Sequence, residues 1–91
     1  HEARKRDQAE QRKRDQALKK RRARIEDLEG RIAEREQAIR DVEAAMAAPG
    51  FYDDRAKSQP VIDRHHALMW EVGDLMHQWE ELQRLTETDP T

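Results

Sequence analysis

Positively charged side chains crowd the start of the sequence, which favours contact with an anionic partner. Residues 1–24 hold eleven Lys or Arg against four Asp or Glu, whereas residues 25–91 hold seven against sixteen. Cations at this density can neutralise several phosphates, and a helix of mixed Lys and Arg contacts mainly the nucleic-acid backbone. We therefore predict binding to DNA or RNA without sequence specificity. The candidate phosphate contacts are Arg4, Lys5, Arg6, Arg12, Lys13, Arg14, Lys19, Lys20, Arg21, Arg22 and Arg24.

A second interpretation of residues 1–24 is a solvated linker helix whose charges serve only to keep it soluble. The segment repeats Arg-Lys-Arg-Asp-Gln-Ala at positions 4–9 and 12–17, and these residue types favour helix. Leu18 is its only large apolar residue, so the segment has no apolar stripe to bury. Both interpretations predict a solvated helical extension.

The other polar residues form no catalytic or metal-binding pattern. His65 and His66 lie close to Asp63, but adjacent side chains on a helix point about 100° apart and do not face one ion. We expect His65 in a helix seam, His66 in solvent, and no metal or other cofactor. A Gly-rich phosphate loop, a Ser-His-Asp order and an HExxH motif do not occur in the sequence, so we do not expect an enzyme in this stretch.

The composition is typical of long helices or of disorder. Of the 91 residues, 42% are charged and 35% are hydrophobic, and there is no Cys. The lack of Cys fits a reducing compartment, and no apolar run approaches the roughly 18 residues of a membrane span. We expect a cytoplasmic protein without membrane contact. The sequence opens in mid-pattern at His1, which suggests a piece of a larger protein.

Pro49 and Gly50 mark a break between two helices. Proline lacks a backbone N–H and clashes with the preceding turn, and glycine accepts the positive φ that closes a helix. The chain then has to turn back. Phe51 and Tyr52 follow at once, and we expect their rings to cover the end of the helix pair, with a partner contact as the alternative.

The helix before this break carries a coiled-coil seam. Its seam positions alternate three and four residues apart, and six of the seven are apolar. Arg35 is the exception, and its stem can lie along the seam while the guanidinium reaches a carboxylate. The seam residues are Ile25, Leu28, Ile32, Arg35, Ile39, Val42 and Met46.

The helix after the break has the same alternation. Ser58 is a good N-cap, Pro60 is tolerated in the first turn, and the Pro of Asp89-Pro90 ends the pattern. Trp79 falls on the seam and is expected in the core. Trp70 falls on the outer side, as a partner contact or as incidental packing. The seam residues are Val61, His65, Leu68, Val72, Leu75, Trp79, Leu82 and Thr86.

The two seams predict an all-α fold, an antiparallel two-helix coiled-coil hairpin with a basic helical N-terminal extension. Residues 1–24 form the extension, and residues 25–91 form the hairpin. Within the hairpin we expect helices over 25–48 and 58–87, joined by a tip over 49–57.

Turning the chain back at the tip brings Met46 opposite Val61, and the register then closes without slippage down both helices. Arg35 falls opposite Val72 and near Gly73, whose missing side chain leaves room beside it. The second helix runs out near Arg21, so about 20 residues, or about 30 Å of the first helix, extend unpaired. The remaining pairs are Val42 with His65, Ile39 with Leu68, Ile32 with Leu75, Leu28 with Trp79 and Ile25 with Leu82.

Three motifs follow one another in a family-specific order. They are Ile25-x-x-Leu28-Glu29-x-x-Ile32-x-x-x-Glu36-x-x-Ile39-x-x-x-Glu43, then Met46-Ala47-Ala48-Pro49-Gly50-Phe51-Tyr52-Asp53, then Leu75-x-x-x-Trp79-Glu80-Glu81-Leu82. In this order they resemble the C-terminal coiled-coil domain of ABC-F ATPases of the Uup type. In that family the domain follows two ATP-binding cassettes through a Lys/Arg-rich helical linker, which residues 1–24 resemble.

The resemblance implies a coiled-coil hairpin that contacts nucleic acid, either DNA or, in full-length relatives, ribosomal RNA during translation. It also implies a parent ATPase whose ATP-binding cassettes are partners within the same chain. A rival hypothesis is a structural coiled coil that joins protein chains through Trp70, Phe51 and Tyr52, and self-association stays open.

Overall fold

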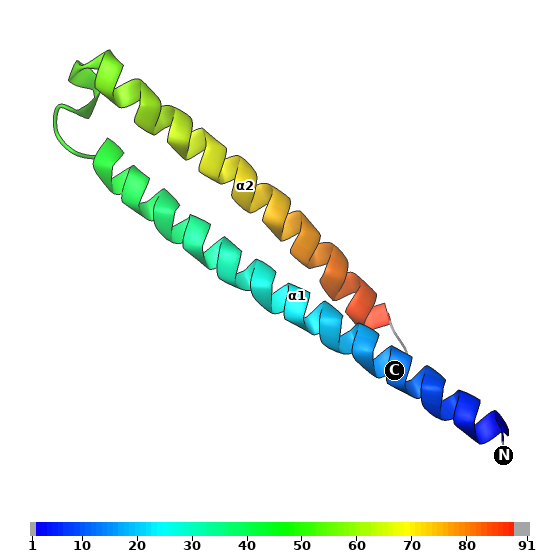
Figure 1. Cartoon of the computed structure of the whole chain (residues 1–91). Coiled ribbons are helices and arrows are strands. Elements are labelled where there is room, and N and C mark those ends of the chain that lie inside the picture. The colour runs from blue at the N-terminus through cyan, green and yellow to red at the C-terminus, as the bar shows by residue number, and fades with distance from the viewer. Residues whose placement is uncertain (1, 89–91) are drawn as a thin grey trace.

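The computed structural model describes residues 2–88 as two long helices lying side by side (Figure 1). Helix α1 spans Glu2–Met46, the short 3-10 helix η1 spans Phe51–Asp53, and α2 spans Arg55–Thr88. The chain reverses at η1, so α1 and α2 run antiparallel in a rod of 77 × 16 × 16 Å. Over the described residues there is no strand, which confirms the predicted all-α helical hairpin.

The two predicted seams form the core between the helices. Every seam residue of α1 from Ile25 to Met46 is buried or half-buried, and so is every seam residue of α2 from Val61 to Thr86. Leu28 is fully buried and Leu68 is 1% exposed. The three-and-four alternation therefore identified the buried face of both helices.

Polar contacts between the helices fit the predicted register. Arg35 Nε lies 3.3 Å from Glu71 Oε2, and Glu71 is the neighbour of Val72. His65 Nε2 lies 3.7 Å from Glu43 Oε1, and Glu43 follows Val42, the predicted partner of His65. The prediction that the Arg35 guanidinium reaches a carboxylate is confirmed.

The predicted role of Gly73 is wrong. A Cβ built at Gly73 would meet no heavy atom within 4 Å, so no side chain of the described residues occupies space beside it. Gly73 instead lines a shallow hollow on the outside of α2 together with Trp70 and His77. Arg35 gains its room without the glycine, because its guanidinium lies toward Glu71.

The tip closes with the glycine conformation that the sequence predicted. Helix α1 ends at Met46, two residues before the predicted end, and Gly50 follows with a φ of 78°. Phe51 and Tyr52 then pack edge to face, with ring centroids 4.8 Å apart. Phe51 is half-buried, as a covering ring should be, but Tyr52 is 64% exposed and covers nothing in the core.

The start of α2 corrects the predicted cap. The helix begins at Arg55, three residues before the predicted start, because Asp54 caps it: Asp54 Oδ1 accepts the backbone N–H groups of Ala56 at 3.0 Å and Lys57 at 3.4 Å. Ser58 is a buried residue inside the helix. Pro60 therefore lies in the second turn instead of the first. The predicted stop at Asp89-Pro90 lies outside the described residues.

Neither α1 nor α2, as far as they are described, contains a segment long and apolar enough to cross a membrane.

Candidate nucleic-acid interface

The N-terminal part of α1 extends past the end of α2 and carries the predicted phosphate contacts (Figure 1). Arg21 Nη1 donates to the backbone oxygen of Leu85 at 3.4 Å, close to the end of α2 at Thr88. Residues 2–20 are exposed apart from the half-buried Leu18. The pairing therefore stops near Arg21, as predicted, and a charged helix extends beyond it.

Six of the cations gather on one side of this extension. Because α1 is one continuous helix, residues seven apart lie nearly above one another, with a step of about 10.5 Å. Lys5, Arg12 and Lys19 form one row by this rule. The residue that follows each of them is also a cation, and these three form a second row about 100° further around the helix. We call the six residues Lys5, Arg6, Arg12, Lys13, Lys19 and Lys20 the basic face.

The basic face points away from the side on which α2 packs. The seam of α1 continues from Ile25 through Arg21 and Leu18, and helical geometry places this line roughly 150° from the middle of the basic face. By the same geometry Asp7 and Glu10 lie on the seam side. Asp15 lies between the two sides and accepts a 3.1 Å hydrogen bond from Gln11, and Glu2 is the one carboxylate of the extension on the basic side. A phosphate backbone can therefore approach the basic face without meeting the hairpin.

Three of the predicted contacts make hydrogen bonds within the chain. Arg12 Nε donates to the backbone oxygen of Gln8 at 3.4 Å within the extension, where its side chain stays exposed. The Arg21 guanidinium donates to the Leu85 carbonyl, and Arg24 binds Asp27 at 2.9 Å and Gln78 at 3.1 Å, so these two belong structurally to the end of the hairpin. The other three predicted cations, Arg4, Arg14 and Arg22, lie on α1 outside the basic face.

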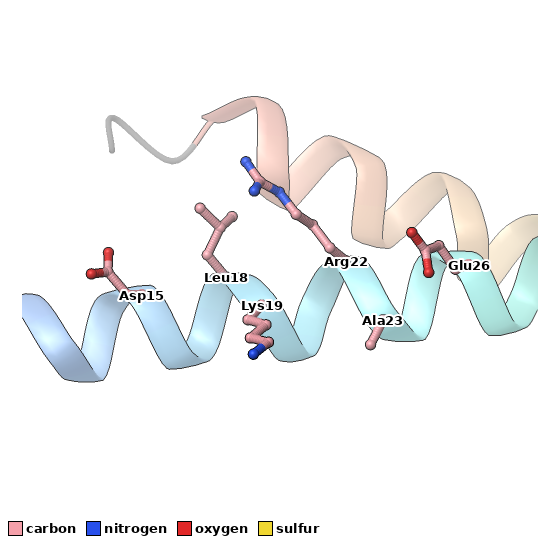
Figure 2. A pocket seen from close by; sticks show the side chains of 6 residues that line it. All are labelled: Asp15, Leu18, Lys19, Arg22, Ala23 and Glu26. Carbon is pink, nitrogen blue, oxygen red and sulfur yellow. The ribbon is translucent and has the colours of Figure 1, made fainter.

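A shallow hollow marks the place where α2 ends. Figure 2 shows Leu18 and Arg22 directed to the side of α2, while Lys19 and Ala23 point the other way in this view. Two carboxylates, those of Asp15 and Glu26, also line the hollow and balance its two cations. Balanced charge around an apolar centre does not suit a phosphate, so the open basic face is the better interface.

One comparison with known proteins decides the family. A family model described as the ABC transporter C-terminal domain matches residues 5–84. The chain belongs to this family. The matched range starts inside the basic extension and runs through both helices of the hairpin, so extension and hairpin form one family unit. No curated protein and no solved structure matches the chain.

Membership makes the chain an accessory domain of an ABC protein. The histidines of this ABC C-terminal domain lie as the sequence predicted: His65 is half-buried in the seam and His66 is exposed. Their ring centroids are 6.2 Å apart. Within residues 2–88 no group of three or more His, Cys, Asp or Glu side chains is placed to hold a metal ion.

Sequence reasoning missed a second apolar stripe on this ABC C-terminal domain. Trp70 was placed on the outer side of α2, and it is 81% exposed. Beside it five residues repeat the four-and-three spacing of the seam on a different side of the helix. We call Ile62, His66, Met69, Gly73 and Met76 the outer stripe. The same alternation that identified the seam would have identified this stripe.

Proposed function

We propose that this ABC C-terminal domain binds nucleic acid without sequence specificity and that its parent is an ABC-F ATPase of the Uup type. The basic face carries the proposal, because its six cations lie exposed on a continuous helix that extends past the hairpin. The domain has no catalytic role of its own in this proposal. ATP hydrolysis belongs to the ATP-binding cassettes of the parent chain, and the protein acts in the cytoplasm.

The mechanism is electrostatic. Each Lys or Arg of the basic face that meets a phosphate releases a condensed counterion, so affinity falls as salt rises. The face offers charges in two parallel rows and no groups arranged to read base edges, so binding depends little on sequence. DNA and ribosomal RNA both meet these requirements.

The hairpin determines how the nucleic acid can lie. Residues 25–91 hold sixteen Asp or Glu against seven Lys or Arg, so this part of the rod repels phosphates. The extension is therefore the part of the domain that a phosphate backbone can approach. Packing against α2 fixes the direction of α1, so the basic face holds a set angle to the hairpin.

A matched pair of triple variants tests the proposal. The first, Arg12→Gln, Lys13→Gln and Lys19→Gln, neutralises half of the basic face. The second, Arg4→Gln, Arg14→Gln and Arg22→Gln, removes the same charge from the other sides of the extension. Binding to duplex DNA, single-stranded DNA and a structured RNA is measured over several salt concentrations.

We expect the basic-face triple to reduce the slope of log affinity against log salt by about 2 to 3 for all ligands. The off-face triple should reduce it clearly less, and a fragment that begins at Ile25 should not bind. Equal effects of the two triples would show that only net charge matters. Absence of binding by the intact domain would overturn the proposed function. The ranking of the three ligands would name the partner.

A further inference from the structure

We propose that the outer stripe of α2 is a docking surface for a basic amphipathic helix of another protein segment. The surface combines the outer stripe with Trp70 and His77, which lie along one side of it. Trp70 is 81% exposed, Met69 is 52% exposed and Met76 is 43% exposed. Trp is enriched at the hot spots of protein interfaces, and Met is over-represented at adaptable binding surfaces.

The spacing of the outer stripe fits a helix as the occupant. Its five positions alternate four and three residues apart, the pattern by which one helix packs along another. Two shallow hollows lie along it. Met69, Trp70, Gly73, Asp74 and His77 line the first, and Glu29, Ile32, Ala33, Glu36, Met76 and Trp79 line the second, which opens between α1 and α2. Side chains of a third helix can enter both.

Gly73 leaves open space beside Trp70 in the outer stripe. A Cβ built there would meet nothing within 4 Å, and the same is true of Gly30, so packing within the chain requires neither glycine. Of the two, only Gly73 lies in the outer stripe, where the missing side chain leaves room for a close approach by the backbone or a side chain of a partner helix.

Charge decides the chemistry of the partner. Asp74 lines the first hollow, and Glu29 and Glu36 line the second, so carboxylates border the stripe on both sides. Arg40 continues the row of Glu29 and Glu36 on α1 and donates to Gln37 at 2.7 Å, while Asp74 accepts from Gln78 at 2.9 Å. Both groups keep their charge, so three carboxylates outnumber one guanidinium along the stripe. A helix with an apolar stripe and Lys or Arg along both flanks complements this surface.

The same carboxylates argue against two other occupants. A second copy packed through this face would bring Asp74, Glu29 and Glu36 toward the like charges of its partner, which is unfavourable. Nucleic acid would bring phosphates to the same carboxylates. The docking surface and the basic face are therefore separate, and neither requires the other.

A designed peptide serves as the probe. It contains about three heptads with Leu at the a and d positions and Lys at e and g. The matched control peptide replaces each of these Lys residues with Glu. Both peptides carry like charges along the seam edges and so resist pairing with themselves. Binding of the labelled peptides to the intact 91-residue chain is followed by fluorescence anisotropy.

We expect the Lys peptide to bind and the Glu peptide not to bind. Trp70→Ala should weaken binding about 30-fold or more, whereas Tyr52→Ala, which removes the exposed ring at the tip, should change it less than twofold. Gly73→Leu should raise the melting temperature and still weaken binding at least tenfold. Gly30→Leu, at a second helix position with nothing within 4 Å of its Cβ, should raise the melting temperature without affecting binding.

Several results would overturn the proposal. Equal affinity for the two peptides would show that the carboxylates do not select the partner. Unchanged binding by Trp70→Ala or Gly73→Leu would place the peptide elsewhere. Sedimentation that shows a dimer, lost in Trp70→Ala, would make a second copy the occupant. Weaker DNA or RNA binding by Trp70→Ala, with the basic-face cations intact, would assign the stripe to nucleic acid.

Discussion

Replacing Arg35 with Leu should stabilise the hairpin. Arg35 is the one charged residue among the seven seam positions of α1, and Leu at such a position buries well, as the fully buried Leu28 shows. Arg35→Leu removes one ion pair and adds apolar surface to the core. The sign of the effect depends on which of these contributes more.

The structure limits both contributions. Arg35 contacts Glu71 at 3.3 Å and Glu34 at 3.5 Å, but these carboxylates are 45% and 76% exposed. Pairs exposed to this degree contribute about 0 to 1 kcal/mol. Burying a Leu side chain contributes about 1.5 to 3 kcal/mol, of which the stem of Arg35 already supplies a part, since that side chain is only 33% exposed. We expect a net gain of about 1 kcal/mol.

Urea denaturation followed by circular dichroism and by Trp fluorescence measures this gain. The second signal matters because Trp79 lies in the seam, whereas dichroism also reports the helix of the exposed extension. In thermal unfolding, about 1 kcal/mol corresponds to about 4 to 8 °C for a domain of this size. Arg31→Leu is the matched control, because Arg31 is exposed and pairs with Asp27 at 3.0 Å on the outside of α1.

The reasoning is refuted if Arg35→Leu destabilises the hairpin, or if Arg31→Leu stabilises it equally. The first result would mean that the Arg35 ion pairs contribute far more than exposed pairs do. The second would mean that helix propensity, not burial in the seam, produces the gain.

Three further predictions follow from the core, the cap and one ion pair. Leu28→Ala should lower the free energy of unfolding by about 2 to 5 kcal/mol, because Leu28 is fully buried. Circular dichroism should then show a hairpin that is largely unfolded near room temperature. In urea denaturation, Asp54→Ala should lower the free energy of unfolding by about 0.5 to 2 kcal/mol, because Asp54 caps α2, and Ser58→Ala should lower it clearly less. A larger loss for Ser58→Ala than for Asp54→Ala would identify Ser58 as the cap. Finally, the hydrogen bond and charge of Arg84 lower the pKa of Glu81, so the pair stabilises α2 at neutral pH, and this contribution is lost as pH falls below the ordinary Glu range. Glu81→Gln should remove that part of the pH dependence of the melting temperature, and an unchanged pH profile would contradict the pairing.

Periodicity predicted the fold because the buried positions of a helix recur every three or four residues, and apolar residues therefore recur in the sequence at the same spacing. All fifteen seam positions became buried or half-buried, and the end of the pairing near Arg21 followed from counting residues. The cap of α2 could not be predicted in this way. Asp54 and Ser58 are both good capping residues, and the choice depends on where η1 releases the chain, which is a property of the folded tip.

The prediction of the site was limited because it treated all eleven cations alike. Composition identified them, and the predicted register, in which the second helix runs out near Arg21, already placed Arg21 and Arg24 beside α2. The register did not show which acceptors their side chains reach, namely the Leu85 carbonyl and the Gln78 side chain. The distribution of the others around the helix was available from the sequence once a continuous helix was assumed. The outer stripe was missed for a different reason, since one apolar seam already accounted for the fold of α2.

The separation of charge along the rod gives the two proposed surfaces different partners. In the two proposals, the excess of carboxylates on the hairpin keeps phosphates on the extension, and Asp74, Glu29 and Glu36 beside the outer stripe attract a basic helix. A nucleic acid bound at the basic face would therefore leave the outer stripe free. If both surfaces work as proposed, this ABC C-terminal domain can hold a nucleic acid at one end and a protein helix along its side at the same time. Saturating amounts of DNA or RNA should then leave the affinity for the Lys peptide unchanged, whereas strong competition would mean that the two ligands share one surface.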